Sequence, residues 1–458
     1  DEVIETYQTL VNPGVPIPEF IQRLTHITPQ QVKRAPFFSS VASEIEEFLG
    51  ADPIIGHNIQ FDIGFLASNG VSLSNPSYDT WDLASVFMPQ SRQYSLKYLT
   101  AHFQVEHNDA HRALADAMAT KNVYIKLLRL AAEQDSGLLS YLSNLAARSR
   151  WSISGILAGL EGTGDAQTSS VGLTGLDLEQ LAIRLGSPEK RRADPALSDL
   201  NEDKVAGLLA QNGPFAKVFS GFEHRPEQEE MLNGVTEAMY HNQHLVVEGG
   251  TGVGKSMAYL LPAALFAISK GQRVVISTNT INLQEQLMNK DIPALIEVLE
   301  KSGLVEEGVL KAALLKGRAN YLCLRRWNHL ARSESPTIDD ARLLSKTSVW
   351  MQSTLSGDRA EINLSGRDFA SWNHISAGEK GFCPGLRDGS PCFLRAARER
   401  AEQAHIVVVN HALLLSDLAR GGGLIPEYQH LVIDEAHNLE DEATRQLGFN
   451  VSQDKLDE

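Results

Sequence analysis

A glycine-rich loop in the second half of the chain restricts its fold more than any other feature of the sequence. Residues 249–256 read Gly-Gly-Thr-Gly-Val-Gly-Lys-Ser, the full G-x-x-x-x-G-K-[ST] pattern of a phosphate-binding loop. An apolar run at 245–247 precedes the loop and a helical pattern over 257–266 follows it, so we predict a strand, the loop and a helix in that order. Glycines let the backbone N–H groups of such a loop turn toward a triphosphate. The predicted ATP contacts are Gly249, Gly250, Thr251, Gly252, Val253, Gly254, Lys255 on the β- and γ-phosphates, and Ser256 on Mg²⁺.

An acidic motif at a second strand end complements this loop. Residues 431–437 read Leu-Val-Ile-Asp-Glu-Ala-His, an apolar strand that ends in two carboxylates. Asp434 is placed to hold Mg²⁺, and Glu435 is placed to orient the attacking water. Upstream of the loop, Gln228 is predicted to hydrogen-bond the adenine edge with support from Arg225; the alternative is a solvated polar helix start. The combination indicates a nucleotide-driven motor.

Strand-like and helical segments alternate around these motifs. Alternation with phosphate chemistry at strand ends predicts a parallel, doubly wound sheet, that is, an α/β fold. Thr278, Asn279 and Thr280 follow one of the strands, where small hydroxyls and an amide suit contacts to the backbone of a nucleic acid. The predicted strands in this half are 245–247, 273–277, 406–409 and 431–433.

Length and composition set the broad class. The chain has 458 residues, of which 43% are hydrophobic, and this is enough for about three domains. No apolar stretch has membrane-spanning length, so we expect no membrane partner. Three cysteines are too few for a disulfide framework and indicate a reducing cytoplasm. The net charge of −16 describes the whole chain and says little about a local nucleic-acid groove.

We divide the chain into three expected domains. Residues 1–132 form the first, with strands at 5–11 and 53–55 and helices at 61–68 and 110–131. Residues 133–215 are a linker region with some helix, rich in glycine and proline breakers. Residues 216–458 form the nucleotide-binding domain, with a mostly irregular, cysteine-containing insertion at 316–400.

The first domain carries its own candidate site. Asp62 lies near the start of one predicted helix, and His111 and Asp116 lie near the start of another. Two carboxylates and a histidine from separate segments could gather around divalent metal, with the imidazole deprotonating a metal-bound water. The alternative for Asp62 is an ordinary helix cap.

These residues resemble the DEDDh 3′-to-5′ exonucleases, a family with a ribonuclease H-like fold. The segment from His57 to Asp62 looks like the second family motif, and His111 with Asp116 looks like the third. The resemblance implies that Asp116 is a direct ligand of Mg²⁺ or Mn²⁺, that His111 is the general base, and that Asp62 acts on the metal or its water. The family's first motif, Asp-x-Glu, is expected upstream of residue 1, so we predict little nuclease activity for residues 1–458 alone.

The second half resembles the DinG/XPD family of superfamily 2 DNA helicases. The most particular signatures are 316–323, Lys-Gly-Arg-Ala-Asn-Tyr-Leu-Cys, and 407–415, Val-Val-Val-Asn-His-Ala-Leu-Leu-Leu. The resemblance implies ATP-driven 5′-to-3′ translocation on DNA with a single-stranded tail. A second RecA-like domain is expected beyond residue 458. An exonuclease domain ahead of such a motor is a known arrangement of DinG-like proteins.

The cysteines leave two alternatives open. Many members of this family bind a [4Fe-4S] cluster with four cysteines in the interval that holds Cys323, Cys383 and Cys392. Thiolate clusters normally take four such ligands. A cluster here would need His374 or Asp388 as the fourth; otherwise the three thiols are ordinary side chains.

The leading hypothesis is an ATP-dependent DNA helicase fused to a 3′-to-5′ exonuclease domain, acting in DNA repair or replication. One alternative is a 3′-to-5′ exonuclease whose ATP-binding domain regulates or positions it without unwinding. Another is that the first domain is a non-catalytic module that binds DNA or protein.

Overall fold

The chain folds into two compact units. The structure, a computed structural model, describes residues 2–107, 112–161, 177–194, 197, 202–218, 223–250, 252–378 and 390–448. The first unit comprises Asp1–Leu181 and Leu322–Ala377, and the second comprises Ala182–Tyr321 and Gly378–Glu458. A segment from the second half of the sequence therefore belongs to the first unit. The expected domain boundaries at 132 and 215 remain a prediction about the sequence.

The second unit is built on a parallel sheet, as predicted. Its four strands lie in the order β4-β5-β3-β6, and every neighbouring pair is parallel. In the register of the sheet Thr278 is level with Asn410, and Ser277 is level with Ile433, so the carboxyl ends of three adjacent strands share one edge. The strands are β3 (Val274–Thr278), β4 (Ala312–Leu314), β5 (Ile406–Asn410) and β6 (His430–Ile433).

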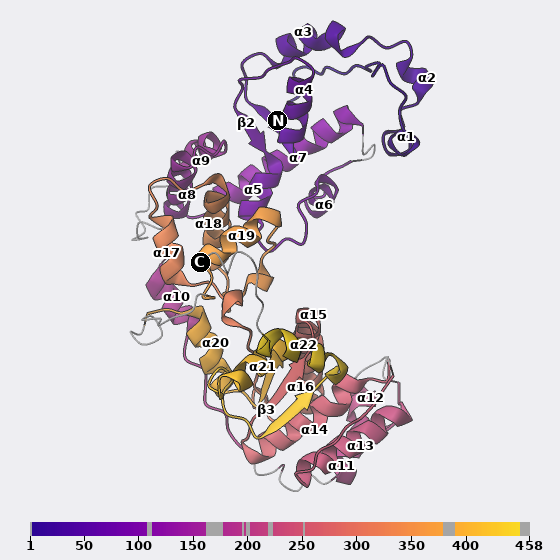
Figure 1. The fold of residues 1–458 in the computed structure, drawn as a ribbon, viewed down its shortest axis with the longest axis vertical. Coiled ribbons are helices and arrows are strands. Elements are labelled where there is room, and N and C mark those ends of the chain that lie inside the picture. The colour runs from indigo at the N-terminus through magenta and orange to yellow at the C-terminus, as the bar shows by residue number, and fades with distance from the viewer. Residues whose placement is uncertain are drawn as a thin grey trace. The chain divides into compact units, whose positions relative to one another are not determined.

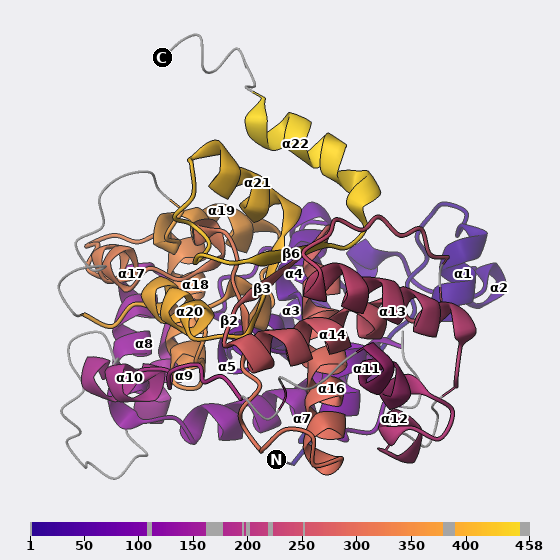
Figure 2. The ribbon, with the colours of Figure 1, turned by 90° about the horizontal axis from the view of Figure 1, so that it is seen from below.

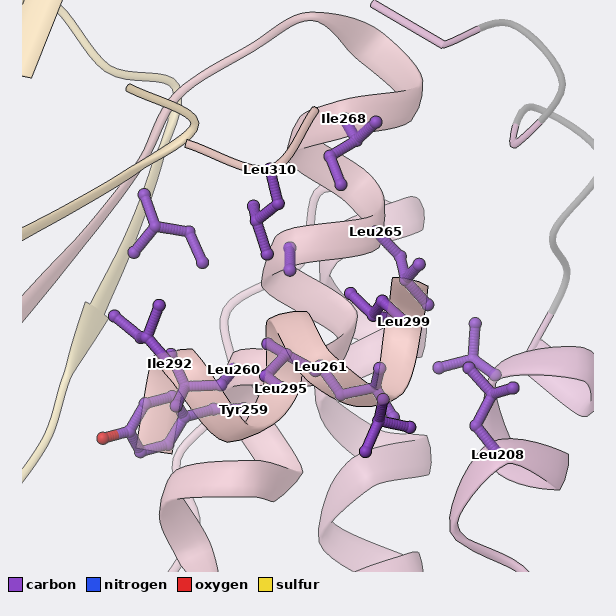
Figure 3. Packing of buried hydrophobic residues seen from close by; sticks show 14 of the residues in the cluster. Leu208, Tyr259, Leu260, Leu261, Leu265, Ile268, Ile292, Leu295, Leu299 and Leu310 are labelled. Carbon is purple, nitrogen blue, oxygen red and sulfur yellow. The ribbon is translucent and has the colours of Figure 1, made fainter. Parts of the chain in front are cut away.

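Helices pack beside this sheet around one apolar core. α14 (Lys255–Lys270) is buried over most of its length and runs beside α13 (Pro226–Tyr240) and near α16 (Ile292–Lys301) (Figures 1 and 2). Leucines of α14 and α16 interdigitate, and Tyr259 lies at the margin of this cluster with its hydroxyl pointing away from the leucines (Figure 3). This packing holds the start of α14, and with it the phosphate loop, on a rigid support.

The strand predicted at 245–247 is wrong. Residues 243–250 form no strand, and the side chain of Val246 is 97% exposed. A strand needs a hydrogen-bonding neighbour, and among the described residues β6 pairs only with β3. After β3 the chain forms α15 (Ile281–Gln286), which continues through a π-helical turn, η2 (Leu287–Asp291).

The first unit contains a two-stranded parallel sheet with helices around it. β1 (Ile54–Gly56) and β2 (Ser77–Asp79) pair in parallel, and each leads directly toward a helix, α4 (Ile59–Ser68) and α5 (Thr80–Phe87) respectively. The strand at 53–55 and the helix at 61–68 are therefore confirmed within a residue or two. The strand predicted at 5–11 is wrong: that segment is extended and irregular, with an isolated bridge between Asn12 and Phe37 beside it.

The expectation of a mostly irregular insertion at 316–400 is also wrong. This region contains α17 (Leu324–Ala331), α18 (Ile338–Met351) and α19 (Gly366–Ile375), and α18 packs on α5 and on α8 (Ser136–Arg148). The amide of Asn363 donates to the carbonyl of Arg92 at 3.1 Å, so the early chain and this segment are bonded directly. Polar residues buried in these helices hide their apolar periodicity.

Two buried ion pairs fasten this segment within the first unit. Arg342 on α18 lies 2.9 Å from Asp82 on α5, which also accepts the indole N–H of Trp151 at 2.8 Å. Lys346, one turn further along α18, lies 2.6 Å from Asp368, and both side chains are almost completely buried. Charges buried in this way are stable only when paired.

None of the helices in the described part of the chain is long and apolar enough to cross a bilayer. The other helices are α1 (Glu19–Thr25), α2 (Pro29–Val32), α3 (Phe38–Leu49), α6 (Leu96–His102), α7 (Ala113–Ala132), α9 (Ser154–Glu161), α10 (Leu178–Leu185), α11 (Glu202–Leu209), α12 (Pro214–Val218), α20 (Phe393–Glu402), α21 (His411–Ala419) and α22 (Leu439–Leu447).

Candidate active sites

The phosphate loop has the backbone conformation that its glycines allow. Gly252 and Gly254 both have φ of +84°, a region that side chains with a Cβ rarely adopt. At Gly254 a Cβ would also lie 2.3 Å from the amide nitrogen of Gln228, so glycine is required twice over. Gly254 then serves as the N-cap of α14, and the N-terminus of that helix points its free N–H groups at the loop. Thr251 lies outside the described residues.

Gln228 and Arg225 contact this loop directly. The amide of Gln228 donates to the carbonyl of Gly254 at 2.8 Å, and the guanidinium of Arg225 donates to the carbonyl of Gly252. Both side chains therefore hold the loop from the start of α13. The predicted contact of Gln228 with adenine stays a prediction.

Lys255 and Glu435 bring the two nucleotide motifs together. The Lys255 ammonium lies 3.1 Å from the Glu435 carboxylate, although the residues are 180 positions apart in the chain. Glu435 has φ of +54°, an uncommon conformation for a non-glycine residue that often marks a functional position. The lysine is therefore close to the acidic motif as well as to the loop.

Asp434 and Ser256, the two predicted Mg²⁺ ligands, both face the hydroxyl of Tyr259. The hydroxyl lies 3.3 Å from Asp434, and it also bonds the side chain of Ser256. Burial raises the pKa of Asp434, and the neighbouring Glu435 raises it further, whereas the bond to Tyr259 and the Lys255 charge lower it. A carboxylate and a hydroxyl oxygen are ligands that Mg²⁺ prefers, so these residues fit that metal.

Tyr259 is a site residue that the sequence reasoning missed. Its apolar neighbours identify it as part of the helix core, and its ring does pack there. Burial raises the pKa of its hydroxyl well above the usual range, so the group stays protonated and can donate to Asp434. Its position one turn after Ser256 was the available signal, because residues three apart share a helix face.

The predicted nucleic-acid loop is partly engaged within the protein. Thr278 is fully buried, and the hydroxyl of Thr280 accepts the N–H of Leu283 at 3.2 Å as the cap of α15. Asn279 is partly exposed and Thr280 is exposed. A contact with a nucleic acid would therefore fall to Asn279, Thr280 and the backbone between them.

The predicted nuclease residues lie on two helices of the first unit. Asp62 is in the first turn of α4 and Asp116 is in the first turn of α7. Burial raises the pKa of Asp62, and a backbone hydrogen bond partly offsets this. His111 lies outside the described residues.

His107 is a contact of Asp116 that the sequence did not indicate. The ring Nε2 lies 2.6 Å from a carboxylate oxygen of Asp116, and the histidine side chain is only 9% exposed. A bond to one carboxylate oxygen fixes the orientation of Asp116. A histidine preceding the motif by a few residues carries no signal of its own.

The second exonuclease-like motif is held by Asp79. Its carboxylate accepts the backbone N–H groups of Asn58, Ile59 and Trp81 at 3.0, 3.1 and 2.8 Å. One carboxylate thereby fastens the starts of α4 and α5. Next to it His57 bonds the Thr80 hydroxyl at 2.9 Å, and burial lowers the pKa of this histidine to about 4.

Metal coordination by protein side chains alone is not seen in the described residues. No three His, Cys, Asp or Glu among them are grouped closely enough to hold a metal ion. Cys323 and Cys392 are not in disulfide bonds and belong to different units, and Cys383 and Asp388 lie outside the described residues. The ring of His374 lies 3.3 Å from the carboxylate of Asp340. A cysteine cluster is therefore not confirmed.

Known protein families match the exonuclease-like part and the nucleotide-binding part of the chain separately. Residues 1–124 match the family model described as exonuclease, residues 225–304 match DEAD/DEAH box helicase, and residues 385–456 match DEAD_2. Over 98% of its length the chain is 28% identical to the 3′-5′ exonuclease DinG of Bacillus subtilis and 27% identical to that of Staphylococcus epidermidis. The chain is similar to DinG proteins along nearly its whole length. Both resemblances drawn from the motifs are confirmed by these matches.

The chain spans about half the length of the curated relatives it matches, 47% and 48% of the two DinG proteins above. The 3′-5′ exonuclease DinG of Staphylococcus aureus is 26% identical over 99% of the chain, and the match covers 48% of the length of that relative.

Proposed function

We propose that this chain is part of an ATP-dependent DNA helicase of DinG type that carries a 3′-to-5′ exonuclease domain and acts in the cytoplasm in DNA repair or replication. The DinG-like sequence and the exonuclease and helicase matches support both activities. Its substrate would be DNA with a single-stranded tail.

The observation that carries the motor half of the proposal is the contact of Lys255 with Glu435. It joins the phosphate loop and the acidic motif at one end of a parallel sheet, where nucleotides bind in such folds. Lys255 would bind the β- and γ-phosphates, and Glu435 would accept a proton from the attacking water. Mg²⁺, held by Ser256 and Asp434, would neutralise phosphate charge, and Tyr259 would orient that carboxylate.

ATP hydrolysis with and without single-stranded DNA tests this half. Glu435→Gln keeps the shape of the side chain and removes the base, so we expect nucleotide binding to persist while turnover falls about a hundredfold or more. Lys255→Ala should weaken nucleotide binding itself. Glu442→Gln, on the neighbouring helix α22, is the matched control and should turn over normally. Equal turnover by the Glu435→Gln and control proteins would contradict the assignment.

For the nuclease half, we propose that Asp62, Asp116 and His111 act on the metal-bound water, with His107 orienting Asp116. The second candidate function, an exonuclease whose ATP-binding domain only regulates or positions it, is favoured by the name of the relatives, which are called 3′-5′ exonuclease. Digestion of a labelled strand in Mn²⁺, with and without ATP, separates the two: the regulatory candidate requires digestion to depend on nucleotide while duplex DNA stays paired.

An iron-sulfur cluster on Cys323, Cys383 and Cys392 is the further proposal left open by the sequence. Anaerobic purification followed by iron and acid-labile sulfide analysis decides it. Four iron atoms per chain would support the cluster, and a colourless protein without iron would refute it.

A further inference from the structure

His411 is a buried histidine that the proposed mechanism does not use. It is the first residue of α21, directly after β5, and its side chain is fully buried. Its ring Nδ1 lies 2.7 Å from the hydroxyl of Ser277 at the end of β3. A hydrogen bond this short between buried groups fixes both side chains.

The same ring also borders the acidic motif. The backbone of Ser277 accepts the N–H of Asp434 at 2.8 Å, so the residue bonded to the histidine is also bonded to the end of β6. Burial lowers the pKa of His411, and backbone groups of Glu435 and Asp434 lie close enough to the ring to offset part of this effect. The ring Nε2 is buried and makes no well-aligned hydrogen bond.

One imidazole therefore adjoins the ends of three neighbouring strands. β5 carries the histidine, β3 leads through Ser277 into Thr278, Asn279 and Thr280, and β6 leads into Asp434 and Glu435. Nucleic-acid contacts are expected at the end of β3 and hydrolysis at the end of β6. A movement of either strand end must change the contacts of His411, because a filled core leaves the ring no free space.

We propose that His411 is a positioning residue that couples nucleotide binding at the acidic motif to single-stranded nucleic acid bound after β3. This inference rests on the proposed function. The Nε2 of His411 has no well-aligned hydrogen bond and faces the acidic motif: a buried donor or acceptor without a good partner is costly, and a backbone shift at Asp434 or Glu435 would supply one. The ring would then be hydrogen-bonded to Ser277 and to the acidic motif in one backbone arrangement of Asp434 and Glu435, and to Ser277 alone in the other.

The test measures thermodynamic coupling in residues 1–458. The dissociation constant of a fluorescent, non-hydrolysable ATP analogue is measured with and without saturating oligothymidine. Linked sites typically change one another's affinity by about 5-fold or more. We expect such a change in the wild type and a ratio near one in His411→Asn, whose amide can replace Nδ1 toward Ser277 but cannot reach the acidic motif.

His405 provides a matched control. It is also fully buried, it lies just before β5 rather than just after it, and its ring bonds the Lys311 N–H and the Arg192 carbonyl. His405→Asn should lower the melting temperature about as much as His411→Asn but keep the wild-type coupling ratio.

Three outcomes separate the claims. A wild type that binds no nucleotide refutes the proposed function, and the inference falls with it. A wild type that binds nucleotide and shows coupling, with the same ratio in His411→Asn, refutes the inference alone. Loss of coupling in both histidine variants also refutes it, because the effect would then be general destabilisation.

Discussion

Removing the charge of Arg342 should destabilise the first unit by a predictable amount. The guanidinium is bonded to Asp82 on α5 and to Asp339 on its own helix, both at 2.9 Å, and it lies over the rings of Trp81 and Trp151. Arg342→Met preserves much of the packing and removes the charge. Asp82, only 12% exposed, then keeps one neutral donor, the indole of Trp151.

The expected cost follows from the partners left behind. Breaking a buried ion pair by removing one member costs about 3–5 kcal/mol, and slight exposure places this pair at about 3 kcal/mol. Asp82→Asn should cost less, about 1–2 kcal/mol, because Arg342 retains Asp339 as a partner. The double variant should cost less than the sum of the two, by about 1–3 kcal/mol, because the residues are in contact.

Thermal and urea unfolding of residues 1–458 measure these values. For a unit of this size about 3 kcal/mol corresponds to a decrease of roughly 6–12 °C in the transition of the first unit. Lys301→Met is the control: its bond to Glu297 is shorter, 2.6 Å, but both side chains are exposed, so the change in the free energy of unfolding should stay below about 1 kcal/mol. Strict additivity of the Arg342 and Asp82 changes, or an Arg342→Met protein as stable as the control, would refute the reasoning.

Three further predictions concern single side chains. Loss of the bond to Asp116 in His107→Ala should weaken Mn²⁺ binding about tenfold, and His107→Gln should restore part of it; calorimetric titration with equal affinities for all three proteins would exclude the positioning role. Tyr259→Phe should lower the stability of the second unit by about 1 kcal/mol in urea titration, and an unchanged midpoint would mean that its hydroxyl makes no net contribution. Burial lowers the pKa of His405 from 6.5 to about 4. The unfolded chain therefore takes up a proton near pH 6.5 while the folded chain does not, so the free energy of unfolding should be constant above pH 6.5 and fall toward pH 4 by at most about 3 kcal/mol. His405→Gln should remove that part of the pH dependence, and parallel curves for the two proteins would contradict the assignment.

The local structure around the nucleotide motifs could be predicted from the sequence because these motifs combine local geometry with chemistry. Glycines with positive φ, a helix starting at Lys255 and an apolar strand before Asp434 each act over a few residues, and all three are found. The parallel direction of the strands also followed from the alternation of strand-like and helical segments. What failed was the strand at 245–247, because an apolar run becomes a strand only where a neighbour pairs with it.

The fold of 322–377 could not be read from the sequence for a physical reason. α18 buries Asp340 and Lys346, and α19 buries Asp368, so the pattern of apolar positions on which a prediction depends is broken by charges. Those charges are stable because of partners far away in the chain. The contacts of His107 and His411 were hidden for the same reason: each depends on a tertiary neighbour that no local pattern specifies.

The most direct test of the central claim uses the complete protein, wild type and Lys255→Ala, on a 5′-tailed duplex labelled so that displaced strands are distinguished from shortened ones. We predict strand displacement that requires ATP and is lost in Lys255→Ala, while shortening from 3′ ends requires only divalent metal. Shortening with no displacement under any condition would contradict the helicase assignment, and if that shortening also depended on ATP it would support the ATP-regulated exonuclease in its place.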